Sequence, residues 1–100
     1  MPNAFPADKP AAVEAPWFVY ILECNDGSLY TGVTNNIERR VQQHNDGDGA
    51  RYTRSRRPVR LRYHETCESR SAALLRECAL RLLSRKEKDA LLAKHDATKP

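Results

Sequence analysis

Residues 17–34 read WFVYILECNDGSLYTGVT, and this stretch decides the fold. Aromatic and β-branched side chains favour a strand from Trp17 to Cys24, and the segment from Leu29 to Thr34 reads as a second strand. The four residues between them, Asn-Asp-Gly-Ser, are typical of a turn. The two strands are therefore predicted to form a β-hairpin.

The length of the hairpin loop decides which side chains share a face of the sheet. A two-residue Asp-Gly loop places Tyr20 and Tyr30 on opposite faces. A three-residue loop over residues 25–27, with its glycine in the left-handed region, pairs Leu22 with Tyr30 and brings both tyrosines to one face. Because Asn-Asp-Gly suits a type I turn followed by a left-handed glycine, we expect the second register.

A short helix is predicted directly after the hairpin. Asn35 and Glu38, three residues apart, form a capping-box pattern at its start. Ile37 and Val41 give the helix one buried stripe, and it is expected to end near His44.

The rest of the chain predicts one more strand and two more helices. Apolar and basic residues alternate in the expected strand, with Val59, Leu61 and Tyr63 on a buried face and Arg60, Arg62 and His64 on a basic one. Ser69 is a candidate cap for a second helix, and a break near Ser84 precedes a shorter helical run that ends at Ala93. The expected apolar stripe of the second helix is Ala72, Leu75, Ala79, Leu82 and Leu83. The order ββαβαα predicts an α+β fold, a small three-stranded antiparallel sheet with flanking helices.

Length and composition limit the chain to one small domain. Of its 100 residues, we expect 1–15 to be a disordered Pro/Ala-rich leader, 16–95 the folded domain and 96–100 a tail. No segment approaches the roughly 18 apolar residues of a membrane span, and the leader lacks the pattern of a secretory signal. We therefore expect a soluble, cytoplasmic protein with no membrane contact. Three cysteines without a C-x-x-C pair argue against disulfides and a zinc site.

Positive charge is concentrated in one part of the chain. The net charge is +4, whereas residues 51–70 alone hold seven arginines and two acids, a net charge of +5. Arginine forks match phosphate oxygens, and an aromatic side chain among them can stack on an unpaired base. The candidate nucleic-acid-binding residues are Arg51, Tyr52, Arg54, Arg56 and Arg57. The alternative interpretation is a solvated basic loop.

Three further side chains are candidates for chemistry. Arg40 and His44 lie four residues apart and project from one side of the first helix, at the edge of its buried stripe. Glu77 is the sole acid between residues 69 and 83. The alternatives are a helix-terminal histidine that favours the helix dipole and a Glu77–Arg81 salt bridge on the surface.

The order of these residues resembles the GIY-YIG nuclease superfamily, and most closely its small stand-alone members. Phe18-Val19-Tyr20 stands where the family has G-I-Y, with phenylalanine in place of the glycine, and Tyr30-Thr31-Gly32 stands where it has Y-I-G. Arg40 matches the helix arginine of the family, His44 the histidine that follows it, and Glu77 the metal-binding glutamate. The resemblance covers residues 16–92. Residues 84–95 contain no asparagine, so the role of a late asparagine of the family is vacant or filled by Lys86 or Lys88.

The resemblance implies a metal-dependent, structure-selective endonuclease that hydrolyses phosphodiester bonds of nucleic acid, with DNA favoured over RNA and a role in DNA repair. The implied catalytic residues are Tyr20, Tyr30, Arg40, His44 and Glu77. Glu77 is the expected ligand of Mg²⁺ or Mn²⁺, and Tyr20 the expected acceptor of a proton from water. The alternative is a non-catalytic nucleic-acid-binding module of the same fold. A recruiting protein partner and the oligomeric state are left open.

Overall fold

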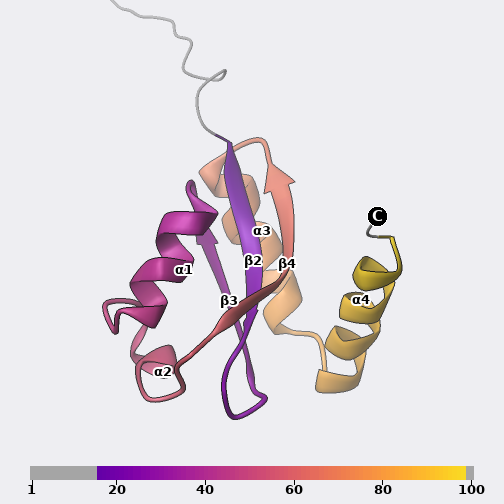
Figure 1. Ribbon diagram of the computed structural model, residues 1–100. Helices are drawn as coiled ribbons and strands as arrows, with labels where there is room; N and C mark the ends of the chain where they lie inside the picture. Colours follow the sequence, from indigo (N-terminus) through magenta and orange to yellow (C-terminus); the bar gives the residue numbers. More distant parts are fainter. Residues whose placement is uncertain (1–15, 99–100) are drawn as a thin grey trace, which may run out of the picture.

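A three-stranded antiparallel sheet forms the centre of the fold. In the computed structural model, which describes residues 16–98, the strands are β2 (Trp17–Glu23), β3 (Leu29–Thr34) and β4 (Arg60–Cys67). Their order is β3-β2-β4, with β2 in the middle (Figure 1). The α+β prediction is confirmed, whereas the predicted leader lies outside the described residues.

The hairpin has the register that the Asn-Asp-Gly loop predicts. Leu22 lies opposite Tyr30, and Tyr20 lies opposite Gly32. The N–H of Gly27 donates to the carbonyl of Cys24 at 2.9 Å, and the φ of Gly27 is +85°, a value that favours glycine. Both tyrosines therefore project from the same face of the sheet.

Four helices accompany the sheet, one more than predicted. They are α1 (Ile37–Asn45), α2 (Arg51–Arg54), α3 (Arg70–Arg81) and α4 (Arg85–Ala97). The additional helix is the short α2, formed by the arginine-rich segment. The side chain of Asn36, not Asn35, caps α1 by accepting from the N–H of Arg39 at 3.1 Å. A capping box between Ser84 and Glu87 starts α4.

The structure extends α4 past its predicted end at Ala93. The helix continues to Ala97, so it includes the first residues of the predicted tail, 96–100. Within residues 16–98, no helix is long and apolar enough to cross a membrane. The three cysteines are free thiols.

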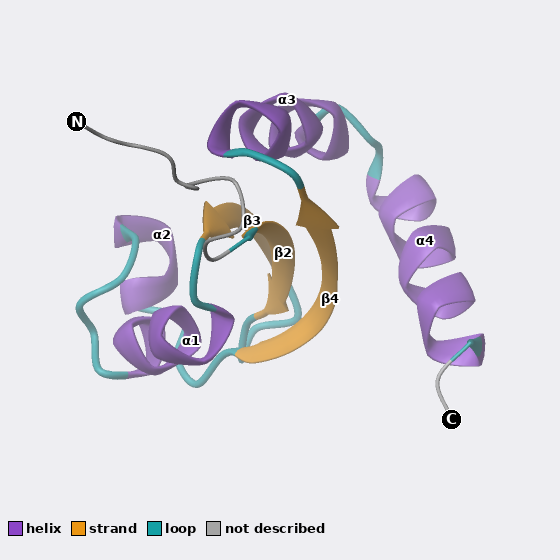
Figure 2. Cartoon of the chain, turned by 90° about the horizontal axis from the view of Figure 1, so that it is seen from above, coloured by secondary structure: helices purple, strands orange, loops and turns teal. Residues whose placement is uncertain are grey.

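The curved sheet is covered on both faces by different helices. Helices α1 and α2 lie on its concave side, and α3 and α4 lie on the other side (Figure 2). One buried cluster, under α3 and α4, consists of Val19, Ile21, Tyr63, Leu80 and Leu92. The other, on the α1 side, consists of Tyr20, Leu22, Cys24 and Val59.

Helix α3 presents a different side to the sheet from the one predicted. Ala73 and Leu80 are buried, whereas Leu75 and Leu82, members of the predicted stripe, are 75% and 85% exposed. Leucines occur on two sides of this helix, so its hydrophobic pattern is ambiguous, and the small Ala73 allows a close approach to the sheet. Since Glu77 lies four residues after Ala73 and three before Leu80, it shares their inward side.

Strand β4 also departs from its predicted alternation. A bulge shifts the pairing with β2 from Ile21–Tyr63 to Leu22–Leu61. As a result Tyr63 packs on the α3 side and Leu61 on the α1 side, so the apolar residues of β4 do not share one face. The basic side chains of β4 are partly neutralised, because Glu23 accepts from both Arg60 and Arg62.

Candidate active site

The buried phenol of Tyr20 lies at the centre of the candidate site. Tyr20 is 1% exposed, and its ring lies over Gly32 of the neighbouring strand. A Cβ atom at position 32 would lie 2.6 Å from Tyr20 Oη and 2.7 Å from Cζ. Only glycine therefore leaves room for the phenol in this position.

A chain of hydrogen bonds joins Tyr20 to α1 and α2. Tyr20 Oη lies 3.0 Å from Nε2 of the fully buried His44, and Nδ1 of His44 lies 2.7 Å from Thr53 Oγ1. The Thr53 hydroxyl donates to the carbonyl of Ala50 at 3.0 Å, so its oxygen accepts from Nδ1–H of His44. Nε2 then carries the lone pair and accepts the proton of Tyr20.

Burial keeps both partners of the Tyr20–His44 hydrogen bond uncharged. It lowers the pKa of His44 to about 4, and the positive charge of Arg40 adds to this effect. Burial raises the pKa of Tyr20 to about 12, against the opposing influence of Arg40. At neutral pH the tyrosine is thus a protonated donor and the histidine a neutral acceptor.

Tyr30 and Arg40 complete this side of the site. The ring of Tyr30 lies 5.3 Å from that of His44 and 6.5 Å from that of Tyr20, and Tyr52 of α2 stacks on it at 6.1 Å. Arg40 is half-buried, donates to Gln43 Oε1 at 3.1 Å, and holds its guanidinium beside the Tyr20 hydroxyl. A cation therefore adjoins the buried phenol.

Glu77 belongs to α3, which covers the opposite face of the sheet from the Tyr20 ring. Its side chain is only 16% exposed, and its negative charge contributes to the raised pKa of Tyr20. Arg81 donates to Glu77 Oε2 at 3.0 Å and to the carbonyl of Thr31 at 3.1 Å. The expected ion pair of Glu77 with Arg81 is thus present, and the same carboxylate acts on the Tyr20 phenol through its charge.

The carboxylate of Glu77 suits a hard divalent cation. Among residues 16–98, no three histidines, cysteines or acids gather into a metal-binding group. Mg²⁺ keeps several waters and is commonly held by one or two carboxylates together with substrate phosphates. Within the described chain, Oε1 of Glu77 has no hydrogen-bond partner, so one carboxylate oxygen is available.

The five nucleic-acid-binding candidates separate into two groups. Arg51 and Arg54 are exposed, and within residues 16–98 their guanidinium groups have no partner. Arg56 forms an ion pair with Asp26 at 3.0 Å and covers the ring of Tyr52 at 3.9 Å. Arg57 donates to the carbonyls of Arg54 and Asn45. Helix α2 therefore presents some arginines outward and uses others to hold its own conformation.

Sequence reasoning missed Thr53. This residue is 0% exposed and holds the imidazole of His44, yet it stands in a run of arginines that reads as a surface loop. Because α2 has four residues, no hydrophobic periodicity marks its buried side.

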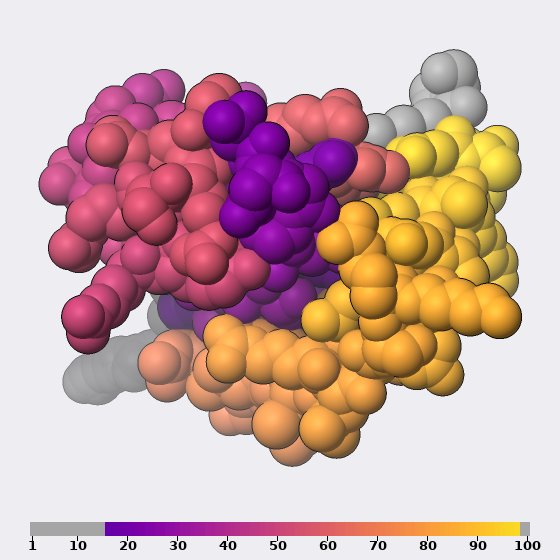
Figure 3. Space-filling view, turned by 90° about the horizontal axis from the view of Figure 1, so that it is seen from below, coloured from indigo at the N-terminus to yellow at the C-terminus, as the bar shows by residue number. Residues whose placement is uncertain are grey.

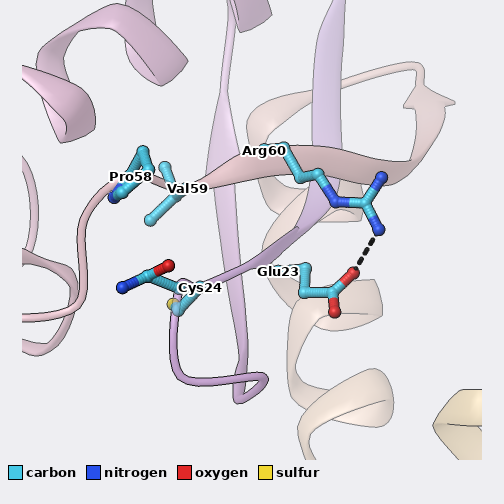
Figure 4. Close-up of a pocket in the computed structure, with 6 residues that line it drawn as sticks. Glu23, Cys24, Pro58, Val59 and Arg60 are labelled. Carbon is cyan, nitrogen blue, oxygen red and sulfur yellow. Dashed lines mark hydrogen bonds and ion pairs between the residues drawn. The ribbon is translucent and has the colours of Figure 1, made fainter.

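A separate hollow lies at the ends of β2 and β4. Glu23, Cys24, Pro58, Val59 and Arg60 surround it, and its volume is about 300 Å³ (Figure 4). The carboxylate of Glu23 in this hollow forms ion pairs with Arg60 at 2.8 Å and with Arg62 at 2.6 Å. None of the catalytic candidates lines this hollow.

Comparison with known proteins places these residues in context. A family model described as the GIY-YIG catalytic domain matches residues 16–89. A UPF0213 protein of Desulfotalea psychrophila is 56% identical over 86 residues, which cover 85% of this chain and 74% of that protein. A UPF0213 protein of Halobacterium salinarum is 53% identical over 73 residues, covering 73% of this chain and 95% of that protein.

Solved structures are similar as well. The solution NMR structure of a UPF0213 protein from Bacillus halodurans has a TM-score of 0.51 and 44% identity, and the match covers 78% of this chain and 83% of that one. An E. faecalis protein, also solved by NMR, has a TM-score of 0.56 and 39% identity, and the match covers 85% of this chain and 91% of that one.

Proposed function

The chain belongs to the GIY-YIG family, and we propose that it is a metal-dependent endonuclease that hydrolyses phosphodiester bonds in nucleic acid, with DNA as the favoured substrate. The observation that carries the proposal is the hydrogen-bond chain from Tyr20 through His44 to Thr53, with Arg40 beside the phenol and the charge of Glu77 acting on it. A module that only bound phosphate would require the cations of this site but no proton acceptor.

The hydrogen-bond chain provides a path for the proton of the attacking water. Tyr20 accepts this proton while its own hydroxyl proton moves along the 3.0 Å hydrogen bond to His44 Nε2. Thr53 keeps the other ring nitrogen protonated, so Nε2 is free to accept. The phenol need not ionise in advance, which its pKa of about 12 disfavours at neutral pH.

This proton path has a cost that the substrate offsets. The pKa of His44, about 4 instead of 6.5, makes the imidazolium about 3 kcal/mol less favourable than in water. A bound phosphate carries negative charge that favours the protonated ring. Proton transfer is therefore coupled to the presence of substrate.

The remaining candidates serve the phosphate group. Arg40, held beside Tyr20, donates to a non-bridging phosphate oxygen and stabilises the charge that grows there in the transition state. The hydroxyl of Tyr30 orients water or phosphate from the neighbouring strand. Glu77 would hold the divalent cation, Mg²⁺ or Mn²⁺. When bound, this ion would neutralise phosphoryl charge and stabilise the leaving oxygen.

Selectivity for strand structure follows from the binding surface. Arg51 and Arg54 are free to contact the phosphate backbone, which carries no base sequence. With four residues, the basic helix α2 is too short to read bases along a groove. Discrimination then depends on nucleic-acid shape and on unpaired segments.

A non-catalytic nucleic-acid-binding module is the second candidate function. The ion pair of Glu77 with Arg81 favours this binding module, because Arg81 neutralises the carboxylate that is assigned to the metal. A binder keeps affinity for nucleic acid without metal-dependent turnover.

One experiment separates the two functions. The purified protein is incubated with Mg²⁺ or Mn²⁺ and labelled single-stranded, duplex, flap and junction DNA, together with matched RNA. The endonuclease proposal requires cleavage that EDTA abolishes and that depends on substrate structure. Binding without cleavage of any member of the panel would establish the binding module instead.

A further inference from the structure

A groove beside the catalytic candidates has no role in the chemistry described above. It is lined by Leu29, Tyr30, Thr31, Tyr52, Arg81 and Lys88, with a volume of about 340 Å³. From below, the hairpin lies between the α2 segment and the α3–α4 end of the molecule (Figure 3). Tyr30 belongs both to this groove and to the site around Tyr20, so the groove adjoins that site.

The charge of the groove is positive and only partly neutralised. None of its lining residues is acidic, whereas Arg81 and Lys88 are cationic. Arg81 is already shared between Glu77 and the carbonyl of Thr31. Within residues 16–98, the ammonium of the half-buried Lys88 has no hydrogen-bond or ion-pair partner.

The acids nearest to Lys88 along α4 have other partners. Glu87 completes the capping box with Ser84, and Asp89 forms an ion pair with Arg85 at 2.8 Å. Arg85 also donates to the carbonyl of Gly27 at 2.9 Å, which fixes the start of α4 against the hairpin turn. Lys88 is thus held at the groove by the helix, with its charge left for a ligand.

We propose that this groove binds the phosphate backbone of the nucleic-acid strand next to the cleaved bond, with Lys88 as its phosphate contact. The inference rests on the proposed function, since it names where the substrate of that site continues. The aromatic wall formed by Tyr30 and Tyr52 supports it, because a sugar packs against aromatic rings while phosphate meets a cation, and Arg56 and the mutual stacking already cover faces of Tyr52. Lys88 thereby acts in substrate positioning and not in proton transfer.

The chain supplies a matched control for the test. Lys86, the other lysine considered from the sequence for the role of the late asparagine, lies on the same helix with the same charge, but it is exposed and does not line the groove. Lys88→Gln and Lys86→Gln therefore remove equal charge from nearby positions. Lys88→Arg keeps the charge and serves as the rescue variant.

Binding of labelled single-stranded DNA and RNA is measured without metal over a range of salt concentrations. Lys88→Gln should flatten the slope of log K against log salt by about 0.7, the value of one phosphate contact on a single strand. Lys86→Gln and Lys88→Arg should retain the parent slope. Equal slopes for the two glutamine variants would overturn the proposed phosphate contact of Lys88 in the groove and leave the proposed function intact. Failure of the parent to bind any strand would overturn both.

Discussion

The clearest consequence of a buried neutral His44 is a loss of stability in mild acid. The folded protein keeps the imidazole unprotonated down to about pH 4, whereas the unfolded chain takes up this proton below its ordinary pKa of 6.5. Between these values the unfolded state binds more protons, so the free energy of unfolding falls as the pH decreases. From pH 7.5 to pH 5.0 the two pKa values give a loss of about 2 kcal/mol.

The range from pH 7.5 to pH 5.0 separates the contribution of His44 to stability from the contributions of the carboxylates. Glu23 has a pKa lowered by its hydrogen bond with Arg62, so its contribution is complete above its ordinary pKa of 4.5 and is lost only below it. Denaturant unfolding at pH 7.5, 6.0 and 5.0 therefore isolates the histidine. In His44→Gln the decrease should vanish, and the exposed His64→Gln should retain it.

A parent protein whose stability is flat over this range would refute the buried neutral imidazole, as would a full decrease in His44→Gln. Should His44→Gln fail to fold, an NMR titration of the parent gives the same information. The imidazole of His44 should remain neutral at pH 5.0.

Further variants test the packing, the histidine orientation and the basic surface. Gly32→Ala places a Cβ 2.6 Å from the phenol oxygen of Tyr20, so thermal unfolding should show a loss of about 1–3 kcal/mol, and cleavage should fall; unchanged stability and activity would contradict the close approach. Thr53→Val leaves the imidazole N–H of His44 without its acceptor, so cleavage should slow by about tenfold or more and its pH profile should change. Thr53→Ser should restore both the rate and the pH profile. Equal cleavage rates for the two variants would exclude the role of Thr53 in positioning His44. Arg54→Ala should flatten the slope of log K against log salt for duplex binding by about 0.9, with little effect on stability. Arg57→Ala should also lower the melting temperature, because it removes hydrogen bonds to two carbonyls. An unchanged slope for Arg54→Ala would exclude Arg54 from the interface.

The hairpin and the order of the site residues could be predicted from the sequence. The turn residues 25–27 determine the register, and the register alone places Tyr20 and Tyr30 on one face. Arg40 and His44 follow on the predicted helix, whose cap is Asn36, one residue after the predicted Asn35. Local chemistry decides each of these features, so a single sequence suffices for them.

The contacts of α2 and α3 could not be predicted in the same way. Helix α3 has leucines on two sides, and the choice between Leu75 and Leu80 depends on how the sheet curves. Exposure of Leu75 turns Glu77 to the inward side of α3, where its side chain is 16% exposed. Thr53 gains its role only when α2 folds back over His44, a tertiary contact that no periodicity announces.

Glu77 is proposed to serve metal-dependent cleavage, while the phenol of Tyr20 passes its proton to His44. The most direct test measures two quantities for the parent, Glu77→Gln and the exposed control Glu68→Gln: the rate of Mg²⁺-dependent cleavage and the affinity for the same DNA without metal. We expect Glu77→Gln to lose about 100-fold or more in rate. Its metal-free binding should be equal or tighter, because a negative charge near the phosphate is removed and Arg81 is released. Glu68→Gln should match the parent in both. Cleavage by Glu77→Gln at the rate of the parent would contradict the assignment of Glu77 to metal-dependent cleavage.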